Sequence, residues 1–140
     1  MALTLTSEQE QIQNEARKFL ENSFDSEKLR GLLRSTGEYD QAFWTACSEM
    51  GWTAAGAPEE LDGLGLGAFD VGIIAEGCGR FVCGAPFLAP TFAAMKLIVE
   101  AGHEALIADL VPGIISGEVR FALAFFEGCL LYTSDAADES

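Results

Sequence analysis

The chain has 140 residues, of which 49% are hydrophobic, so it can build one domain with its own core and is too apolar for an intrinsically disordered chain. Its formal net charge is -14, from 22 acidic and 8 basic side chains, and such a surface repels nucleic-acid phosphates and anionic lipids. The basic residues are scattered along the sequence. These properties argue against a nucleic-acid partner and against a membrane partner.

The cysteines and the N-terminus indicate the compartment. The four cysteines contain no C-x-x-C pair, and His103 is the single histidine, so no metal site is expected. The N-terminus lacks the layout of a secretory signal, and its early glutamates argue against a transit peptide. The longest uncharged run, 81–95, contains Pro86 and Pro90 and is shorter than the roughly 18 apolar residues typical of a membrane span. We therefore expect a soluble, cytoplasmic protein with free thiols.

Apolar residues that recur at helical spacing predict six helices. In chain order they cover residues 7–21, 26–37, 40–51, 70 to a break at 84–86, 87–101 and 104–117. The expected caps of the first three are Thr6 or Ser7, Ser26 and Asp40, because short oxygen-bearing side chains accept the free N–H groups of a first turn. The glycine-rich stretch 52–67 should be a long, packed loop.

The sequence makes more specific predictions for the last two helices. Apolar residues surround nearly the whole circumference of the 87–101 helix, so it should lie in the middle of the bundle. Pro112 should kink or split the final helix, because proline has no N–H and its ring clashes with the preceding turn.

The periodicity changes after Glu118. From Val119 to Phe126 apolar residues face both sides of a period-two pattern, which predicts one buried strand. A lone strand leaves its backbone groups unpaired, and the sequence shows no second strand, so its partners are expected beyond the end of the chain. Residues 128–140 end in a polar tail expected to be disordered. The predicted fold class is all-α, a bundle of about six helices followed by one isolated β-strand segment.

Local features that could carry chemistry have simpler structural explanations. The glycines of 63–67 lack the G-x-G-x-x-G spacing and the lysine of a phosphate loop, so we assign them to turns. His103 has no nucleophile motif around it and is expected at the surface. The acidic residues Glu59, Glu60 and Asp62 are expected to be solvated. A last group could line an apolar cavity or belong to the core, namely Phe81, Phe87, Phe92 and Met95.

Several segments in order resemble the N-terminal domain of the acyl-CoA dehydrogenase family. The similarity covers about residues 3–127, and its most specific part is the Pro58 to Gly67 loop. The matching segments are Leu3-Thr4-Leu5-Thr6-Ser7-Glu8-Gln9, Gly51-Trp52, Ala57-Pro58-Glu59-Glu60-Leu61-Asp62-Gly63-Leu64-Gly65-Leu66-Gly67, Asp70, Ala75-Glu76-Gly77-Cys78-Gly79-Arg80, Gly102 and Ser116-Gly117-Glu118.

The resemblance implies a flavoprotein of three parts, a helical domain, a middle β domain and a C-terminal four-helix domain. Residues 1–117 then form the N-terminal helical domain, 118–127 the first strand of a truncated middle β domain, and 128–140 a disordered or non-native tail. In the family, FAD takes a hydride from the β carbon of an acyl-CoA while a glutamate removes the α proton. That glutamate normally comes from the C-terminal domain, so no catalytic residue is assigned here.

The resemblance also implies candidate site residues. The first β strand of the family leads to a Thr-Glu-Pro motif that faces the flavin, and the matching positions place Phe125 and Phe126 beside FAD. Here the motif reads Phe126-Glu127-Gly128, without the threonine and the proline. The 87–101 helix is similar to the element that borders the acyl pocket, which makes Phe87, Thr91 and Met95 the substrate-pocket candidates.

Two functions follow from the resemblance. The first is an N-terminal fragment of an FAD-dependent acyl-CoA dehydrogenase, inactive alone, whose complete form binds an acyl-CoA substrate and an electron-transfer partner. The second is a non-catalytic helical partner subunit of a heteromeric acyl-CoA dehydrogenase. The 84–90 segment resembles bacterial members that act on steroid-like acyl thioesters and often pair as unlike subunits, so a homo- or hetero-oligomer is expected.

Overall fold

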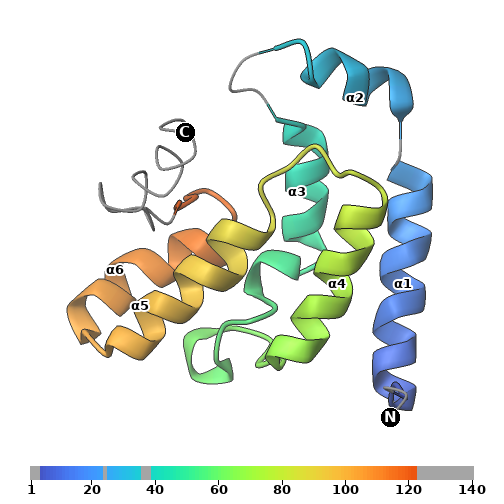
Figure 1. The fold of residues 1–140 in the computed structure, drawn as a ribbon. Helices are drawn as coiled ribbons and strands as arrows, with labels where there is room; N and C mark the ends of the chain where they lie inside the picture. Colours follow the sequence, from blue (N-terminus) through green and yellow to red (C-terminus); the bar gives the residue numbers. More distant parts are fainter. Residues whose placement is uncertain (1–3, 24, 36–38, 123–140) are drawn as a thin grey trace, which may run out of the picture.

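The computed structural model describes residues 4–23, 25–35 and 39–122, and this part of the chain is helical. Its elements are α1 (Ser7–Ser23), α2 (Ser26–Leu32), α3 (Gln41–Glu49), η1 (Trp52–Ala54), η2 (Glu59–Leu61), α4 (Ala68–Arg80), η3 (Ala89–Ala94), α5 (Met95–Ala101) and α6 (Glu104–Ile115). Helices α1 and α4 lie side by side, and α5 and α6 form a hairpin at the other end of the molecule (Figure 1). The predicted helical class is confirmed.

The predicted strand is not seen in the residues that can be described. Residues 119–122 have no regular secondary structure. The rest of the predicted strand, 123–126, and the predicted tail, 128–140, lie outside the described residues.

Hydrogen bonds between side chains tie the start of α1 to the start of α4. The Thr6 hydroxyl accepts the Gln9 N–H at 3.3 Å, and the Gln9 amide oxygen accepts the Thr6 N–H at 3.0 Å, which is a capping box. The Gln9 side-chain nitrogen then donates to Asp70 Oδ1 at 2.9 Å, while Asp70 Oδ2 accepts the Gly67 N–H at 3.1 Å. One carboxylate therefore stabilises the first turn of α4 and fixes α1 against it.

Helix α2 is shorter than predicted. Asp25 caps it instead of Ser26, accepting the N–H groups of Glu27 and Lys28. The helix ends at Leu32, before the predicted stop near Gly37, and it buries none of its residues. Its apolar residues lie at an edge of the molecule with little packed against them.

Helix α3 begins as predicted, because the Asp40 carboxylate accepts the Phe43 N–H at 3.0 Å. Its buried residues are Phe43, Trp44 and Cys47. Met50 follows at the same helical spacing but is 41% exposed, so the buried stripe ends one turn earlier. Gly51 follows with φ 76° and turns the chain into the loop.

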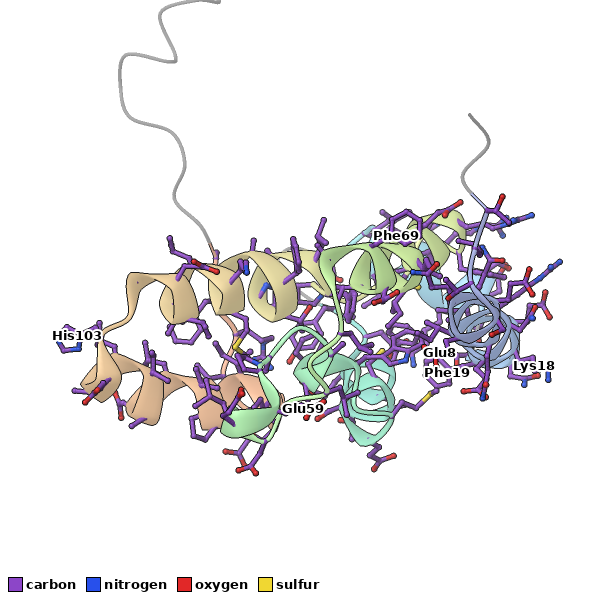
Figure 2. The ribbon with its side chains drawn as sticks, turned by 90° about the horizontal axis from the view of Figure 1, so that it is seen from below. Glu8, Lys18, Phe19, Glu59, Phe69 and His103 are labelled. Atoms are coloured by element: carbon purple, nitrogen blue, oxygen red, sulfur yellow. The ribbon has the colours of Figure 1, made fainter. Side chains whose placement is uncertain are left out.

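The first core cluster is built around four aromatic rings. Phe19 stacks on Phe43 with centroids 5.7 Å apart and meets Trp52 edge-on at 5.0 Å, and Trp52 meets Phe87 edge-on at 5.9 Å. We call these four residues the aromatic cluster. Each such pair of rings adds about 0.5–1.5 kcal/mol of stabilisation beyond that of apolar burial. The ring contacts bring α1, α3 and the loop after α3 together around Trp52. Phe19 faces this centre, whereas Lys18 points away from it (Figure 2).

The second core cluster fills the α5–α6 hairpin. Its buried members are Ala57, Met95, Val111 and Ile114, which we call the hairpin cluster. The prediction that the 87–101 helix lies in the middle of the bundle was wrong, because Leu97 in α5 is 59% exposed. The outer side of α5 has no neighbouring helix among the described residues (Figure 1). Besides Leu97 it carries Lys96 and Glu100, which form an exposed ion pair at 2.7 Å.

The loop between residues 52 and 67 joins the two clusters. It is packed, as predicted, and it also contains the two short 3-10 helices η1 and η2. Its second half folds back on its first half, and the N–H groups of Leu64, Gly65 and Leu66 donate to the carbonyls of Ala54, Ala57 and Ala55 at 3.0, 2.8 and 2.9 Å. A Cβ at Gly63 would lie 2.1 Å from the Ala57 carbonyl oxygen, so only glycine fits there.

Helix α6 runs through Pro112 without a break, contrary to the predicted split. Pro112 and Ala108, four residues earlier, are both exposed. Water can therefore bond the Ala108 carbonyl that proline leaves without an N–H donor. The helix tolerates the proline because the missing bond faces solvent.

Three side chains hold the C-terminal end of α6. Trp44 Nε1 donates to the Gly117 carbonyl at 2.7 Å, Ser48 Oγ to Ser116 at 2.8 Å and Thr53 Oγ1 to Ile115 at 2.6 Å. The last carbonyls of a helix have no partner within it, and here α3 and η1 supply the donors. This carbonyl clamp fixes the hairpin to α3 and sets where the chain leaves α6.

Candidate functional site

The predicted pocket helix begins with a π-helical turn. The element expected over 87–101 is present, and its first part, η3, is π-helical before it becomes the α-helix α5. Pro90 lies at the start of this turn, and Thr91 bonds the Phe87 carbonyl both through its N–H, at 3.3 Å, and through its hydroxyl. π-Helical turns are rare and occur frequently at functional sites, so this turn is the first candidate.

The three pocket candidates lie in this turn, at Thr91, and on either side of it, at Phe87 and Met95, and all three are buried within the chain. Phe87 is 4% exposed, Thr91 1% and Met95 1%. Phe87 belongs to the aromatic cluster and Met95 to the hairpin cluster, so the turn lies where the two cores meet. Their expected role beside an acyl chain stays a prediction, and Phe125 and Phe126, the flavin candidates, lie outside the described residues.

Two hollows lie between α2 and the connector that leads from α4 to η3. The inner one, of about 30 Å³, and the outer, more open one, of about 470 Å³, share Leu29, Leu32, Val82, Cys83 and Gly84. Neither is lined by the three pocket candidates. These hollows give solvent-sized molecules a route to the side chain of Cys83.

An ion pair lines the inner hollow. Lys28 Nζ lies 2.7 Å from Asp40 Oδ1. Burial alone would raise the pKa of Asp40, but the hydrogen bond from Lys28 and those from the backbone of α3 outweigh it and lower the pKa. The carboxylate therefore stays charged and holds α2 against the start of α3.

The connector after α4 begins with a Schellman motif, a hydrogen-bonded helix end. The Cys83 N–H donates to the Cys78 carbonyl at 3.0 Å and the Val82 N–H to the Gly79 carbonyl at 3.1 Å. Val82 has φ 50°, the left-handed conformation that this motif requires and that glycine usually supplies. The motif brings the side chains of its first and last residues, Cys78 and Cys83, into contact.

Three cysteines meet in the core at this connector. Cys47 comes from α3, Cys78 from α4 and Cys83 from the connector, and all three pack in the aromatic cluster's core. Burial raises the pKa of Cys47 to about 12. The hydrogen bond between Cys78 and Cys83, together with burial, raises the pKa of Cys78, while the same hydrogen bond lowers the pKa of Cys83 against the effect of its burial. Cys83 is the thiol most readily ionised among these three.

The sequence reasoning missed this group of cysteines. Their spacing matches no metal or C-x-x-C motif, and Cys47 is 31 positions from Cys78. The available signal was the five-residue step from Cys78 to Cys83 across the end of a predicted helix, where a Schellman motif brings such positions together.

The other features considered from the sequence have structural roles. His103 caps α6 through Nδ1, which accepts the Leu106 N–H at 3.4 Å, and it lies exposed at the tip of the α5–α6 hairpin (Figure 2). The acidic side chains Glu59, Glu60 and Asp62 are exposed as expected. Of the glycines at 63, 65 and 67, only Gly65 has a positive φ, 61°.

Residues 4–23, 25–35 and 39–122 contain neither a candidate metal cluster nor a candidate membrane span. No three histidine, cysteine or acidic side chains among them group so that they could hold a metal ion. No helix in the same ranges has the length and apolar character needed to cross a bilayer.

Comparison with known proteins gives consistent matches. The family model "Acyl-CoA dehydrogenase, N-terminal domain" matches residues 6–118. The acyl-CoA dehydrogenase IpdE2 of Mycobacterium tuberculosis is 31% identical over 91 residues, 64% of this chain and 29% of that protein. FadE26 of the same organism, also an acyl-CoA dehydrogenase, is 26% identical over 132 residues, 91% of this chain and 33% of that protein.

Two solved structures share the fold. A variant of the Tcur3481-Tcur3483 steroid ACAD aligns with a TM-score of 0.78 and 29% identity, covering 89% of this chain and 34% of that chain. The ChsE4-ChsE5 complex from Mycobacterium tuberculosis aligns with a TM-score of 0.81 and 20% identity, covering 91% and 36%. The chain spans about a third of the length of these relatives and structures.

Proposed function

The chain belongs to the acyl-CoA dehydrogenase family, and from this we propose that it is the N-terminal helical domain of a longer FAD-dependent enzyme that oxidises an acyl-CoA thioester. In this proposal residues 1–117 are the helical domain, 118–127 are the first strand of the middle β domain, and 128–140 are a disordered or non-native tail. The domain contributes packing surface and part of the acyl pocket, and it is inactive alone.

The observation that carries the proposal is the extent of the family match. Residues 6–118 run from the capping box of α1 to the carbonyl clamp at the end of α6. They include both core clusters and the loop between them. The match therefore corresponds to a folded unit and not to an isolated motif.

The described residues do not by themselves fit FAD. A dinucleotide brings a pyrophosphate, which needs several cationic or N–H donors directed at one place. Among the described residues, the inner hollow has one basic side chain, Lys28, and the outer hollow has none. A further hollow between α1 and α4 has two, Arg17 and Arg80, and one beside the end of α6 has one, Arg120. We therefore place the FAD site, with Phe125 and Phe126 beside it, in the complete protein, where the flavin supplies the hydride acceptor.

The pocket proposal rests on the π-helical turn. Phe87, Thr91 and Met95 follow one another at four-residue steps before, within and after it, and Thr91 donates a hydrogen bond to the Phe87 carbonyl. We propose that this side of the element borders the acyl group in the complete protein. The name of one structural relative includes "steroid ACAD", which favours a bulky, steroid-like acyl thioester as the substrate.

The test compares the 140-residue chain with the complete reading frame from the same locus. The short chain should be colourless and should not reduce an artificial electron acceptor in the presence of acyl-CoA. The longer protein should be yellow and active, with the electron-transfer partner replaced by the acceptor. Stoichiometric flavin absorbance and turnover from the short chain would overturn the proposal.

A partner-subunit role is the second candidate. One structural relative is a complex of two named chains, ChsE4-ChsE5, and another carries a double name, Tcur3481-Tcur3483. In this version the complete protein is a non-catalytic helical subunit that pairs with an active one. A complete reading frame without a glutamate-bearing C-terminal helical domain would favour this role, and one with it would favour the enzyme.

A further inference from the structure

We propose that Cys78 and Cys83 form a redox-active dithiol that a small peroxide oxidises to an intrachain disulfide. The proposal concerns this chain's own residues and does not depend on the presence of FAD or acyl-CoA. It rests on the geometry of the helix end, on the different accessibility of the cysteines and on the hollow beside Cys83.

The helix end brings the side chains of Cys78 and Cys83 next to each other. The bonds from Cys83 N–H to the Cys78 carbonyl, 3.0 Å, and from Val82 N–H to the Gly79 carbonyl, 3.1 Å, define a Schellman motif. In this motif the third residue from the helix end and the second residue after the cap pack against each other, and these are Cys78 and Cys83. Both side chains pack in the same core, so the fold itself brings the pair close, and closeness is the first condition for a disulfide.

The two cysteines are suited to different steps. Cys83 is half-buried and lines both hollows, the outer of which is open and measures about 470 Å³. Cys78 is 8% exposed and Cys47 is fully buried. A peroxide therefore reaches Cys83 first, and Cys78, which the Schellman motif places beside it, is the thiol that resolves the product. The lowered pKa of Cys83, caused by the hydrogen bond from Cys78, supplies the thiolate that reacts.

The chemistry balances with hydrogen peroxide as the oxidant. The Cys83 thiolate attacks one peroxide oxygen, the O–O bond breaks, and the leaving hydroxide takes a proton to become water. The sulfur is oxidised to a sulfenic acid. The Cys78 sulfur then attacks the Cys83 sulfur, the S–O bond breaks, and a second water leaves. Two thiols and one peroxide thus give one disulfide and two waters.

The backbone conformation of the connector holds the two cysteines together. Val82 has φ 50° and is 60% exposed, so a β-branched residue occupies a conformation that it rarely adopts. Such an outlier persists only where surrounding contacts enforce it, and here the two hydrogen bonds of the motif do so. The position of Cys83 relative to Cys78 is therefore set by the fold and not by chance flexibility.

The test treats the folded chain with hydrogen peroxide and measures its mass. Cys129 is first replaced by serine, so that it cannot pair with another thiol. The expected product is lighter by two hydrogens and regains them with a reductant. Trypsin cleaves after Arg80, between the two cysteines, so the disulfide should appear as a linked pair of peptides. The reaction should be about tenfold faster in the folded chain than in guanidinium, because the fold positions the thiols.

Matched variants locate the bond. Cys78→Ser should lose the linked peptides and accumulate a sulfenic acid on Cys83 that dimedone traps. Cys83→Ser should lose the reaction, and Cys47→Ala should retain it. If Cys78→Ser does not fold, as judged by circular dichroism, Cys78→Ala replaces it. Oxygen addition to Cys83 without a linked pair, a bond that involves Cys47, or equal rates in the folded and unfolded chain would each overturn the proposal.

Discussion

The aromatic cluster and the hairpin cluster differ in the side chains that form them and in how far neighbouring elements enclose them. The aromatic cluster lies among α1, α3, α4 and the loop, and its rings contact one another across three segments that are distant in sequence. The hairpin cluster is aliphatic and lies between α5, α6 and the single loop residue Ala57. The first cluster is enclosed by neighbouring elements, while the hairpin leaves Leu97 and Leu106 59% and 48% exposed.

Different interactions stabilise the two ends of the molecule. The α1–α4 side combines apolar burial with the hydrogen bonds of Gln9 and Asp70. The hairpin relies on the folded-back loop and on the carbonyl clamp supplied by Trp44, Ser48 and Thr53. We therefore expect changes at the loop and at the clamp to loosen the hairpin before they loosen α1 and α4.

The largest effect should come from Gly63, where the loop joins the two clusters. Gly63→Ala would place Cβ 2.1 Å from the Ala57 carbonyl oxygen, so the backbone must move, and the free energy of unfolding should fall by about 3 kcal/mol or more. Urea denaturation measures it. The control is Gly72→Ala in α4, where a Cβ meets nothing within 4 Å. This control should raise stability by about 0.5–1 kcal/mol.

The carbonyl clamp should give the next largest effect. Trp44→Phe removes the 2.7 Å bond to the Gly117 carbonyl and should cost about 2 kcal/mol, because a buried acceptor loses its donor. Hydrogen exchange should accelerate in α6 more than in α1. The exposed Thr45→Ala, on the same helix, should change little. Uniform acceleration of exchange in every helix would contradict the separation of the two regions.

A smaller effect is expected on the opposite side, at Asp70. Asp70→Ala removes the bonds to the Gly67 N–H and to Gln9 and should cost about 1 kcal/mol. A double-mutant cycle with Gln9→Ala should give a coupling energy of about 0.5–1 kcal/mol. Additive effects of the two substitutions would show that the hydrogen bond does not join α1 to α4.

A gain in stability is expected at the connector between the two regions. Val82→Gly relieves the left-handed conformation at φ 50° and loses little packing, because the side chain is 60% exposed. The gain should be about 0.5–1 kcal/mol, since strain relief exceeds the extra unfolded-state entropy of glycine. Thermal denaturation measures it, with Val82→Ala as a partner that should gain less.

The smallest effect concerns the pH dependence of α2 and α3. The pKa of Asp40 is lowered in the folded state by Lys28 and by backbone N–H groups, against the effect of burial. Its contribution is therefore present above the unfolded pKa and is lost as the pH falls through the folded pKa. Asp40→Asn should reduce the loss of unfolding free energy at acid pH by roughly 0.5 kcal/mol. The effect is small because Lys28 is partly exposed to solvent. An unchanged dependence of stability on pH would show that the ion pair between Asp40 and Lys28 contributes nothing to it.

The sequence by itself determined the helical class, the family and most of the helices. Periodic apolar residues and capping side chains are local signals, so α1, α3 and α6 begin where Ser7, Asp40 and Glu104 predicted. Its resemblance segments identified the family that the match to residues 6–118 shows. Some of these segments now have a structural reason, because Gln9 and Asp70 contact each other and Gly63 fits against Ala57.

The tertiary structure alone decided what lies next to what. Apolar residues around a helix indicate that it can be buried, but the number of neighbouring elements decides whether it is. Helix α5 lies at an edge of the molecule, with Leu97 exposed. Pro112 could remain in α6 because its side faces water. The meeting of Cys47 with Cys78 and Cys83 depends on how α3 packs against the end of α4. Such contacts join distant positions, and no local pattern encodes them.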